Sequence, residues 1–337
     1  MTSHQSQTRF APALNTNIRV FQIPRIGESM GQNVRMRTFA RVLHVAVASA
    51  VVVAVGHGVA NAGPTGSSDG IWPAAGPAGL QAVGAALADG ITGTVVWSKQ
   101  AHTPVPIASI TKVMTAVVVI DSNDLERPVT VPAEAVGYCA EHNGSTAGLV
   151  PGEVLTARQL LYGLLLPSGC DAAYALAESF GPGQAGFIAR MNDTARAMGM
   201  GGAQFTDPSG LPNPTDDSTH ATPTDLVTLG ARAMWRIPFR EIVAAHSHHI
   251  AAGPANREHH WETTNRLLRE YPGTIGIKTG NTNAAGHCLL FATVRAGIPL
   301  IGVVLHSSPH SSIAAKEDAE RLLNWAYDPI LGLLPIG

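Results

Sequence analysis

The sequence contains few cysteines and few charged residues. Its 337 residues include 3 cysteines, and charged residues make up 14% of the chain. Three cysteines cannot all pair with one another, and none are spaced as C-x-x-C, so neither a disulfide scaffold nor a zinc ribbon is indicated. Hydrophobic residues make up 45% of the chain, which is typical of a globular protein. The fold therefore relies on a hydrophobic core.

Positive charge is also scarce, and the chain holds only four lysines, Lys99, Lys112, Lys278 and Lys316. The first 62 residues, which are interpreted below as a signal region, contain six arginines and one glutamate. Without this region, the chain has 16 basic residues against 23 acidic ones and a formal charge of −7. Such a balance argues against nucleic acid or an anionic membrane surface as a partner.

The amino-terminal region has the pattern of a secretory signal. Three arginines at positions 35–41 precede an apolar run at 42–55, and Ala60 and Ala62 supply small residues before a cut. We expect export and a mature chain outside the cytoplasm that begins at Gly63. The apolar run is shorter than the roughly 20 residues that span a bilayer. Membrane association is expected only in the alternative case, in which this segment is retained as an anchor.

Three regions follow from this pattern. Residues 1–62 are predicted to be an amino-terminal extension with the signal peptide. Residues 63–79 begin with a Gly/Pro/Ser-rich stretch and are predicted to be a linker. Residues 80–337 show no internal repeat and no second linker, so they are predicted to form one domain.

Hydrophobic periodicity predicts an α/β (α+β) fold with an antiparallel sheet flanked by helices. β-branched and apolar runs predict strands at 94–97, 275–278, 288–294 and 300–305. Helices are predicted at 109–121, 156–166, 170–180, 187–198, 222–235 and 316–327. Because the strands lie at both ends of a helical middle, we expect a sheet built from distant sequence with an inserted all-helical lobe.

A serine and a lysine stand three residues apart at the start of the first predicted helix. Ser109 and Lys112 would project from the same face, within reach of each other. This arrangement suits a serine nucleophile whose proton is taken by a neutral lysine, which needs a lowered pKa. The alternative is a helix-capping serine beside an ordinary lysine.

Two further short motifs follow in order. Ser168 begins a Ser-Gly-Cys sequence that ends at Cys170, on the break between two predicted helices. Lys278, Thr279 and Gly280 lie at the end of a predicted strand. A cation beside a hydroxyl on a strand edge can hold a carboxylate, and a glycine there lets a ligand backbone approach closely.

Together the three motifs resemble those of the serine D-alanyl-D-alanine peptidases among the low-molecular-mass penicillin-binding proteins. That family carries S-x-x-K, S-x-N and K-T-G in this order, and the first and third are intact here. The resemblance extends from about Leu80 to Leu305. It includes the segments 106–116, 164–169 and 264–268. It implies a β-lactamase/transpeptidase-like fold.

The resemblance implies an acyl-transfer mechanism on the D-Ala-D-Ala end of peptidoglycan stem peptides. Ser109 would attack the carbonyl, Lys112 would accept its proton, and Ser168 would relay a proton to the leaving amine. A β-lactam would mimic the substrate and acylate Ser109. No metal and no cofactor is implied, and carboxypeptidase and transpeptidase activities would use the same residues.

The resemblance also assigns substrate-binding residues. Lys278 and Thr279 would hold the terminal carboxylate, and Gly280 would allow close approach. The backbone N–H groups of Ser109 and Asn281 would hold the oxyanion. Cys170 stands where most of the family has asparagine. We expect its thiol to line the cleft beside Ser168; the alternative is a disulfide with Cys139, which export permits.

Rival functions draw on two other patterns. Residues 320–324 spell the E-x-x-L-N motif of class A β-lactamases, but they follow Lys278, so we interpret them as a solvated face followed by core leucines. A catalytically weak wall-binding module remains a second alternative because of Cys170. The histidines at 246–249 and 259–260 are interpreted as exposed residues rather than a metal site, because no carboxylate or cysteine completes a zinc set.

Overall fold

The computed structural model describes residues 72–73 and 75–332. The predicted signal peptide, the extension before it and most of the predicted linker lie outside these residues. Within the described part of the chain, no helix is both long and apolar enough to cross a membrane.

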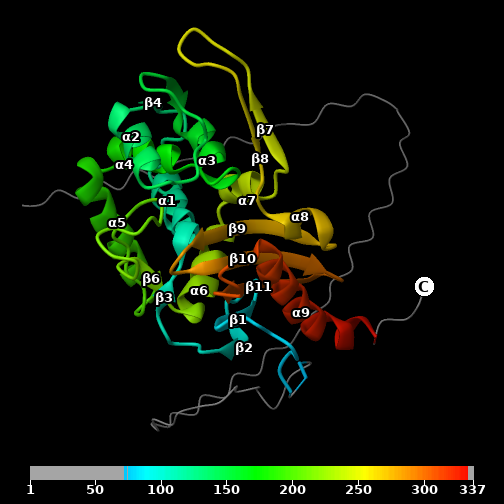
Figure 1. The fold of residues 1–337 in the computed structure, drawn as a ribbon. Coiled ribbons are helices and arrows are strands. Elements are labelled where there is room, and N and C mark those ends of the chain that lie inside the picture. The colour runs from blue at the N-terminus through cyan, green and yellow to red at the C-terminus, as the bar shows by residue number, and fades with distance from the viewer. Residues whose placement is uncertain (1–71, 74, 333–337) are drawn as a thin grey trace, which may run out of the picture. The chain divides into compact units, whose positions relative to one another are not determined.

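A five-stranded antiparallel sheet lies at the centre of the fold (Figure 1). Its strand order is β2-β1-β11-β10-β9, so strands from the beginning and the end of the described chain lie side by side. The turn between the last two strands is Ala296-Gly297, and both residues have positive φ, as a two-residue hairpin requires. The strands are β1 (Gly84–Asp89), β2 (Val95–Lys99), β9 (Thr274–Thr282), β10 (Gly286–Arg295) and β11 (Ile298–Leu305).

The helical lobe is inserted between β2 and β9, as the sequence predicts (Figure 1). It contains a 3₁₀ turn, η1 (Ala108–Ile110), then α1 (Thr111–Ile120), α2 (Ala133–Glu141), α3 (Ala157–Leu165), α4 (Cys170–Phe180), α5 (Gly183–Ala197), α6 (Pro223–Met234) and α7 (Ile237–Val243). Every residue of α1 is buried, and all but Thr111, Lys112 and Thr115 are apolar.

Short elements connect the lobe to the sheet. Three small strand pairs join β3 (Val105–Pro106) to β6 (His220–Ala221), β4 (Pro128–Thr130) to β5 (Val154–Thr156), and β7 (Ser247–Ile250) to β8 (His259–Glu262). Helix α8 (Arg266–Glu270) precedes β9, and α9 (Ser312–Leu331) closes the described chain.

Each face of the sheet has its own core. Ala86 and Ala88 of β1 pack toward the lobe, whereas Ala85 and Leu87 pack toward α9. Successive side chains of a strand point to opposite faces, so a strand buried on both faces is apolar throughout. The sheet is therefore a middle layer between the lobe and α9 (Figure 1).

The predicted helices and strands are confirmed, with shifts of a few residues at their ends. The sequence analysis missed β1, whose alanine-rich Gly84-Ala-Ala-Leu-Ala run carries no strong strand propensity. It also missed the short helices α2, α7 and α8. Tertiary pairing with β11 determines that the alanine run is a strand.

A buried carboxylate attaches the start of the domain to α9. Asp318 is fully buried and accepts hydrogen bonds from the backbone N–H groups of Gln81 (2.9 Å) and Ala82 (2.7 Å). Trp325 donates its indole N–H to the Ala75 carbonyl at 2.6 Å. Packing in the described structure therefore begins before Leu80, the expected start of the domain.

We expect Asp318→Ala to lower the free energy of unfolding by about 3 kcal/mol, because two backbone N–H groups, one of them buried, lose their acceptor and the ion pair with Arg321 is lost. Urea unfolding followed by circular dichroism measures this change. Asp193→Ala is the control, since Asp193 forms only an exposed ion pair with Arg196, and we expect a change below about 0.5 kcal/mol. An Asp318→Ala midpoint equal to that of the wild type would contradict this account.

Candidate active site

Ser109 is presented by a strained turn at the start of α1. The preceding residue, Ala108, has a φ of 48°, a conformation that alanine rarely adopts. Gly210 packs against this turn so closely that a Cβ at position 210 would lie 2.0 Å from the Ala108 carbonyl oxygen. The loop around Gly210 therefore supports the turn that exposes the serine.

Lys112 lies one helical turn beyond Ser109 and is almost completely buried. Its Nζ is 2.7 Å from the Ser109 Oγ and 2.8 Å from the Ser209 carbonyl oxygen. Burial lowers the pKa of Lys112 to about 8, and the nearby carboxylates of Asp207 and Asp171 oppose this shift. A lysine with this pKa is partly neutral near physiological pH, so its lone pair can accept the proton of Ser109.

Lys278 of β9 is the second buried lysine, with 1% of its surface exposed. Its Nζ donates to the Thr279 carbonyl at 2.8 Å. Burial, and then the charge of Lys112, lower the pKa of Lys278 well below its ordinary value. The two amines thus disfavour each other's charge unless an anion binds beside them.

The K-T-G motif lies on β9, the edge strand of the sheet. The Thr279 hydroxyl lies 2.7 Å from that of Thr264. A Cβ at Gly280 would lie 2.8 Å from the Ile107 carbonyl oxygen, so only glycine lets β9 approach the turn that carries Ser109. This glycine determines the distance between the nucleophile and the edge strand.

Ser168 lies on the break between α3 and α4 and has a φ of 69°. A Cβ at the next residue, Gly169, would lie 2.7 Å from both the Ala147 Cβ and the Gly163 carbonyl oxygen. The small residue at position 169 therefore permits the tight turn that directs Ser168 into the pocket.

These residues surround one pocket of about 540 Å³. The residues that line it include Ser109, Ser168, Thr279, Gly280 and Asn281, while Lys112 and Lys278 lie buried behind it. Sequence reasoning missed Asn143 and Ser145, which line the same pocket from the irregular segment after α2. Only the turn-forming Asn143-Gly144-Ser145 sequence marked this segment.

The structure contradicts the expectation that the Cys170 thiol lines the cleft. Cys170 is fully buried and forms a disulfide with Cys139, which was the alternative interpretation. As the first residue of α4, it points toward α2 rather than into the pocket. Its side chain therefore has no direct role in the contacts of the pocket, and Cys288 is the free cysteine of the chain.

The structure also tests the interpretations of the E-x-x-L-N motif and of the histidine clusters. Leu322 and Leu323 are core residues of α9, as expected, and Glu320 pairs with Lys316. His259, expected to be exposed, is buried and contacts Glu153. No group of three or more potential metal-binding side chains occurs among the residues that the structure describes.

Comparison with known sequences identifies similar enzymes. Residues 73–308 match the family model described as D-alanyl-D-alanine carboxypeptidase. The chain is 37% identical over 261 residues to a D-alanyl-D-alanine carboxypeptidase of Streptomyces sp. (strain K15), covering 74% of this chain and 88% of that protein. It is 38% identical over 247 residues to the carboxypeptidase DacB2 of Mycobacterium tuberculosis, covering 72% and 80% of the two chains.

Solved structures agree with the sequence comparison. The fold is similar to that of the Streptomyces K15 DD-transpeptidase, with a TM-score of 0.70 and 36% identity over 75% of this chain and all of that one. A D-alanyl-D-alanine carboxypeptidase from Mycobacterium tuberculosis gives a TM-score of 0.68 with 33% identity, covering 82% of this chain and 98% of that one. The predicted β-lactamase/transpeptidase-like fold is confirmed.

We expect Gly280→Ala to slow the acylation of Ser109 by a β-lactam by at least about tenfold, because the added methyl group collides with the Ile107 carbonyl and displaces the nucleophile. Stopped-flow measurement with a fluorescent penicillin provides the rate. Gly137→Ala is the control, since a Cβ there meets no atom within 4 Å. Equal rates for the two variants would show that β9 and η1 tolerate a wider separation.

Proposed function

Because the chain belongs to the D-alanyl-D-alanine carboxypeptidase family of serine DD-peptidases, we propose that Ser109 is its acylated nucleophile and Lys112 the base that activates it. The observation that carries this assignment is the 2.7 Å contact between the Ser109 Oγ and the buried Lys112 Nζ, at the wall of the pocket. The substrate is the D-Ala-D-Ala end of a peptidoglycan stem peptide, and β-lactams compete for the same serine.

Acylation begins with proton transfer from Ser109 to Lys112. With a pKa of about 8, Lys112 is neutral in about one molecule in ten at pH 7, and in half at pH 8. The Ser209 carbonyl accepts one N–H of the amine and so orients its lone pair toward the serine. The serine oxygen then attacks the carbonyl carbon between the two D-alanines.

The edge position of β9 supports its role in binding the substrate. Alternate N–H and C=O groups of an edge strand are not used by the neighbouring strand, so they remain available to a peptide. We assign the N–H of Asn281, together with that of Ser109, to the oxyanion. Lys278 and Thr279 hold the terminal carboxylate. That anion favours the charged form of Lys278, which burial and Lys112 disfavour in the free enzyme.

Ser168 completes the reaction by passing a proton to the amine of the departing D-alanine. It lines the same pocket as Ser109 and comes from the break between α3 and α4. Water then releases the acyl group in a carboxypeptidase, and a second stem peptide accepts it in a transpeptidase. Both outcomes pass through the same acyl-enzyme and the same residues.

The location of the substrate supports an extracytoplasmic site of action. Peptidases of this family act on the cell wall, and the basic and apolar pattern at 35–62 fits export. We therefore propose an exported enzyme whose catalytic domain starts near residue 80. Membrane association applies only if the apolar segment at 42–55 is retained.

The rival functions have less support. A class A β-lactamase needs a deacylating glutamate in the pocket, but Glu320 pairs with Lys316 in α9, and the leucines of its motif pack in the core. A catalytically weak wall-binding module needs no activated serine. Burying Lys112 against Ser109 is costly, and the nucleophile explains why the chain tolerates that cost.

We expect intact-mass analysis after incubation with penicillin to find one acyl group, and peptide mapping to locate it on Ser109. Ser109→Ala removes the only serine with a lysine three residues further on, so this variant gains no mass. Ser122→Ala is the control, because Ser122 follows α1 and does not line the pocket, so this variant should still gain one acyl group. An adduct on another residue of the wild type would overturn the assignment.

We expect the acylation rate to rise with pH through about 8, because Lys112 accepts the proton only when it is neutral, and its neutral fraction grows as pH increases. Rates measured with a fluorescent penicillin between pH 6 and 10 test this dependence. Lys112→Ala lacks the base, and we expect a loss of about 10³-fold or more. Lys99→Gln, which changes a lysine outside the pocket, retains the wild-type profile. A flat profile for the wild type would exclude Lys112 as the base.

A further inference from the structure

One wall of the pocket is irregular, and its shape depends on buried side chains. Residues 142–153 connect α2 to β5 and contain no helix or strand. Asn143 and Ser145 of this segment line the pocket, as do Thr279 and Asn281 of β9. Without a regular element, the backbone groups of the segment need partners from elsewhere.

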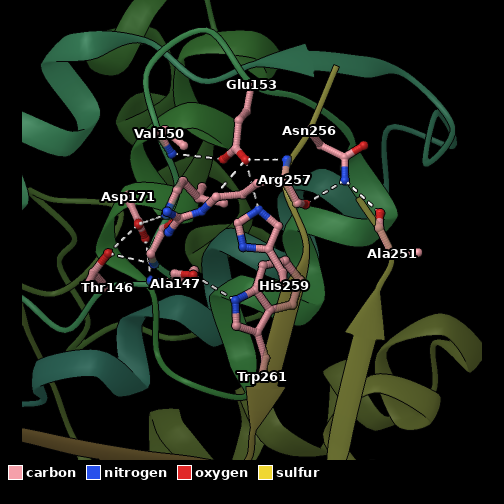
Figure 2. A network of polar contacts seen from close by, with 12 residues as sticks. Thr146, Ala147, Val150, Glu153, Asp171, Ala251, Asn256, Arg257, His259 and Trp261 are labelled. Carbon is pink, nitrogen blue, oxygen red and sulfur yellow. Dashed lines mark hydrogen bonds and ion pairs between the residues drawn. The ribbon is translucent and has the colours of Figure 1, made fainter. Parts of the chain in front are cut away.

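Glu153, the last residue of the segment, bonds both to the segment and to the β7–β8 hairpin (Figure 2). Only 7% of its side chain is exposed. One carboxylate oxygen accepts the Val150 N–H at 2.8 Å, and the other accepts the Arg257 N–H at 2.9 Å. The second oxygen also lies 3.2 Å from the buried His259 Nε2. Burial alone would raise the pKa of Glu153, but the hydrogen bonds from Val150 and Arg257 outweigh it and lower the pKa.

The hairpin of β7 and β8 holds the segment from the outer side. Trp261 donates its indole N–H to the Ala147 carbonyl at 2.7 Å, and the Arg257 guanidinium donates to the Gly148 carbonyl (Figure 2). The rings of His259 and Trp261 stack with centroids 5.1 Å apart. Three residues of the hairpin therefore contact the segment. Trp261 and Arg257 bind the backbone carbonyls of Ala147 and Gly148, and His259 contacts the Glu153 carboxylate.

The inner side of the segment is held by α4. Asp171 is fully buried and accepts the N–H groups of Ala147 at 2.8 Å and Leu149 at 3.0 Å, as well as the Thr146 hydroxyl. The N–H of Cys170 donates to the Ser145 carbonyl at 2.7 Å. The segment is therefore attached to α4, the helix that follows Ser168. Ser168 and the segment at 142–153, which both line the pocket, are thus connected by one network of hydrogen bonds.

We propose that Glu153, with His259 and Trp261 of the hairpin, is a positioning residue that fixes Asn143 and Ser145 for binding of the substrate peptide opposite β9. This inference rests on the proposed function, because it assigns the segment to the wall of the peptide-binding groove. Ionised Glu153 joins the segment to a hairpin more than 100 residues away in the chain. Without it, a backbone N–H on each side loses its acceptor, and the wall loses its fixed position.

The test separates binding from chemistry. Acylation by a fluorescent penicillin is measured over a range of concentrations, which gives the dissociation constant of the first complex and the rate constant of acylation within it. We expect Glu153→Ala to raise the dissociation constant about tenfold and to change the rate constant by less than about threefold, because Ser109 and Lys112 form no hydrogen bond with Glu153, His259 or Trp261. Hydrogen exchange followed by mass spectrometry should become faster at residues 146–150.

Two graded variants accompany this change. Glu153→Gln keeps the volume and one acceptor oxygen, and we expect the dissociation constant to rise about threefold. Trp261→Phe keeps an aromatic ring but removes the indole N–H that holds the Ala147 carbonyl, together with part of the ring volume, and the expected rise is about twofold to threefold. These two variants test the inference even if Glu153→Ala does not fold.

Asp318→Ala is the matched control, since it also removes a buried carboxylate that accepts two backbone N–H groups, but neither Asp318 nor its partners Gln81 and Ala82 line the pocket. We expect it to lower stability and leave the dissociation constant unchanged. An equal rise for Asp318→Ala, or wild-type dissociation constants for Glu153→Gln and Trp261→Phe, would overturn the positioning role. Failure of penicillin to acylate Ser109 in the wild type would instead overturn the proposed function.

Discussion

The burial of Lys112 against Ser109 is the constraint on which the rest of the site depends. An amine removed from water costs several kcal/mol unless it is neutral or hydrogen-bonded, and here it has one carbonyl and one hydroxyl as partners. Asp207 and Asp171 are near enough to oppose the loss of its charge. The burial of the whole of α1 excludes water from this amine, and the same exclusion lowers its pKa into the range that catalysis needs.

That constraint explains the unusual backbone around the site. The Ser209 carbonyl reaches Lys112 because Asp207 accepts the N–H groups of Ser209 at 2.7 Å and Gly210 at 2.8 Å, which fixes the loop. Gly210 and Gly280 then let this loop and β9 approach the turn at Ala108 from two sides. Asp207 therefore acts on the lysine in two ways, through its charge and through the position of a carbonyl group.

The sequence predicted the parts of the site that depend on local pattern. Ser109 and Lys112 are three residues apart on one helix, so their contact follows from helical geometry. The segment at 142–153 was missed because its partners, Arg257, His259 and Trp261, are about 100 residues away and no periodicity connects them. The state of Cys170 likewise depends on the distance from α4 to α2, which residue spacing left open between a thiol and a disulfide.

The pocket lies where the lobe and the sheet meet. Lys278, Thr279 and Asn281 belong to the sheet, whereas Ser168 and the segment at 142–153 belong to the lobe. A substrate peptide placed between them contacts both, so its fit depends on how the lobe is held against the sheet. Helix α1 is buried on all sides and carries Ser109 at its start, so it joins the two parts at the nucleophile. The groove can then keep its width at Ser109 while its outer end is controlled separately by Glu153 and the β7–β8 hairpin. Loss of that outer control should therefore affect binding before it affects the chemistry at the serine.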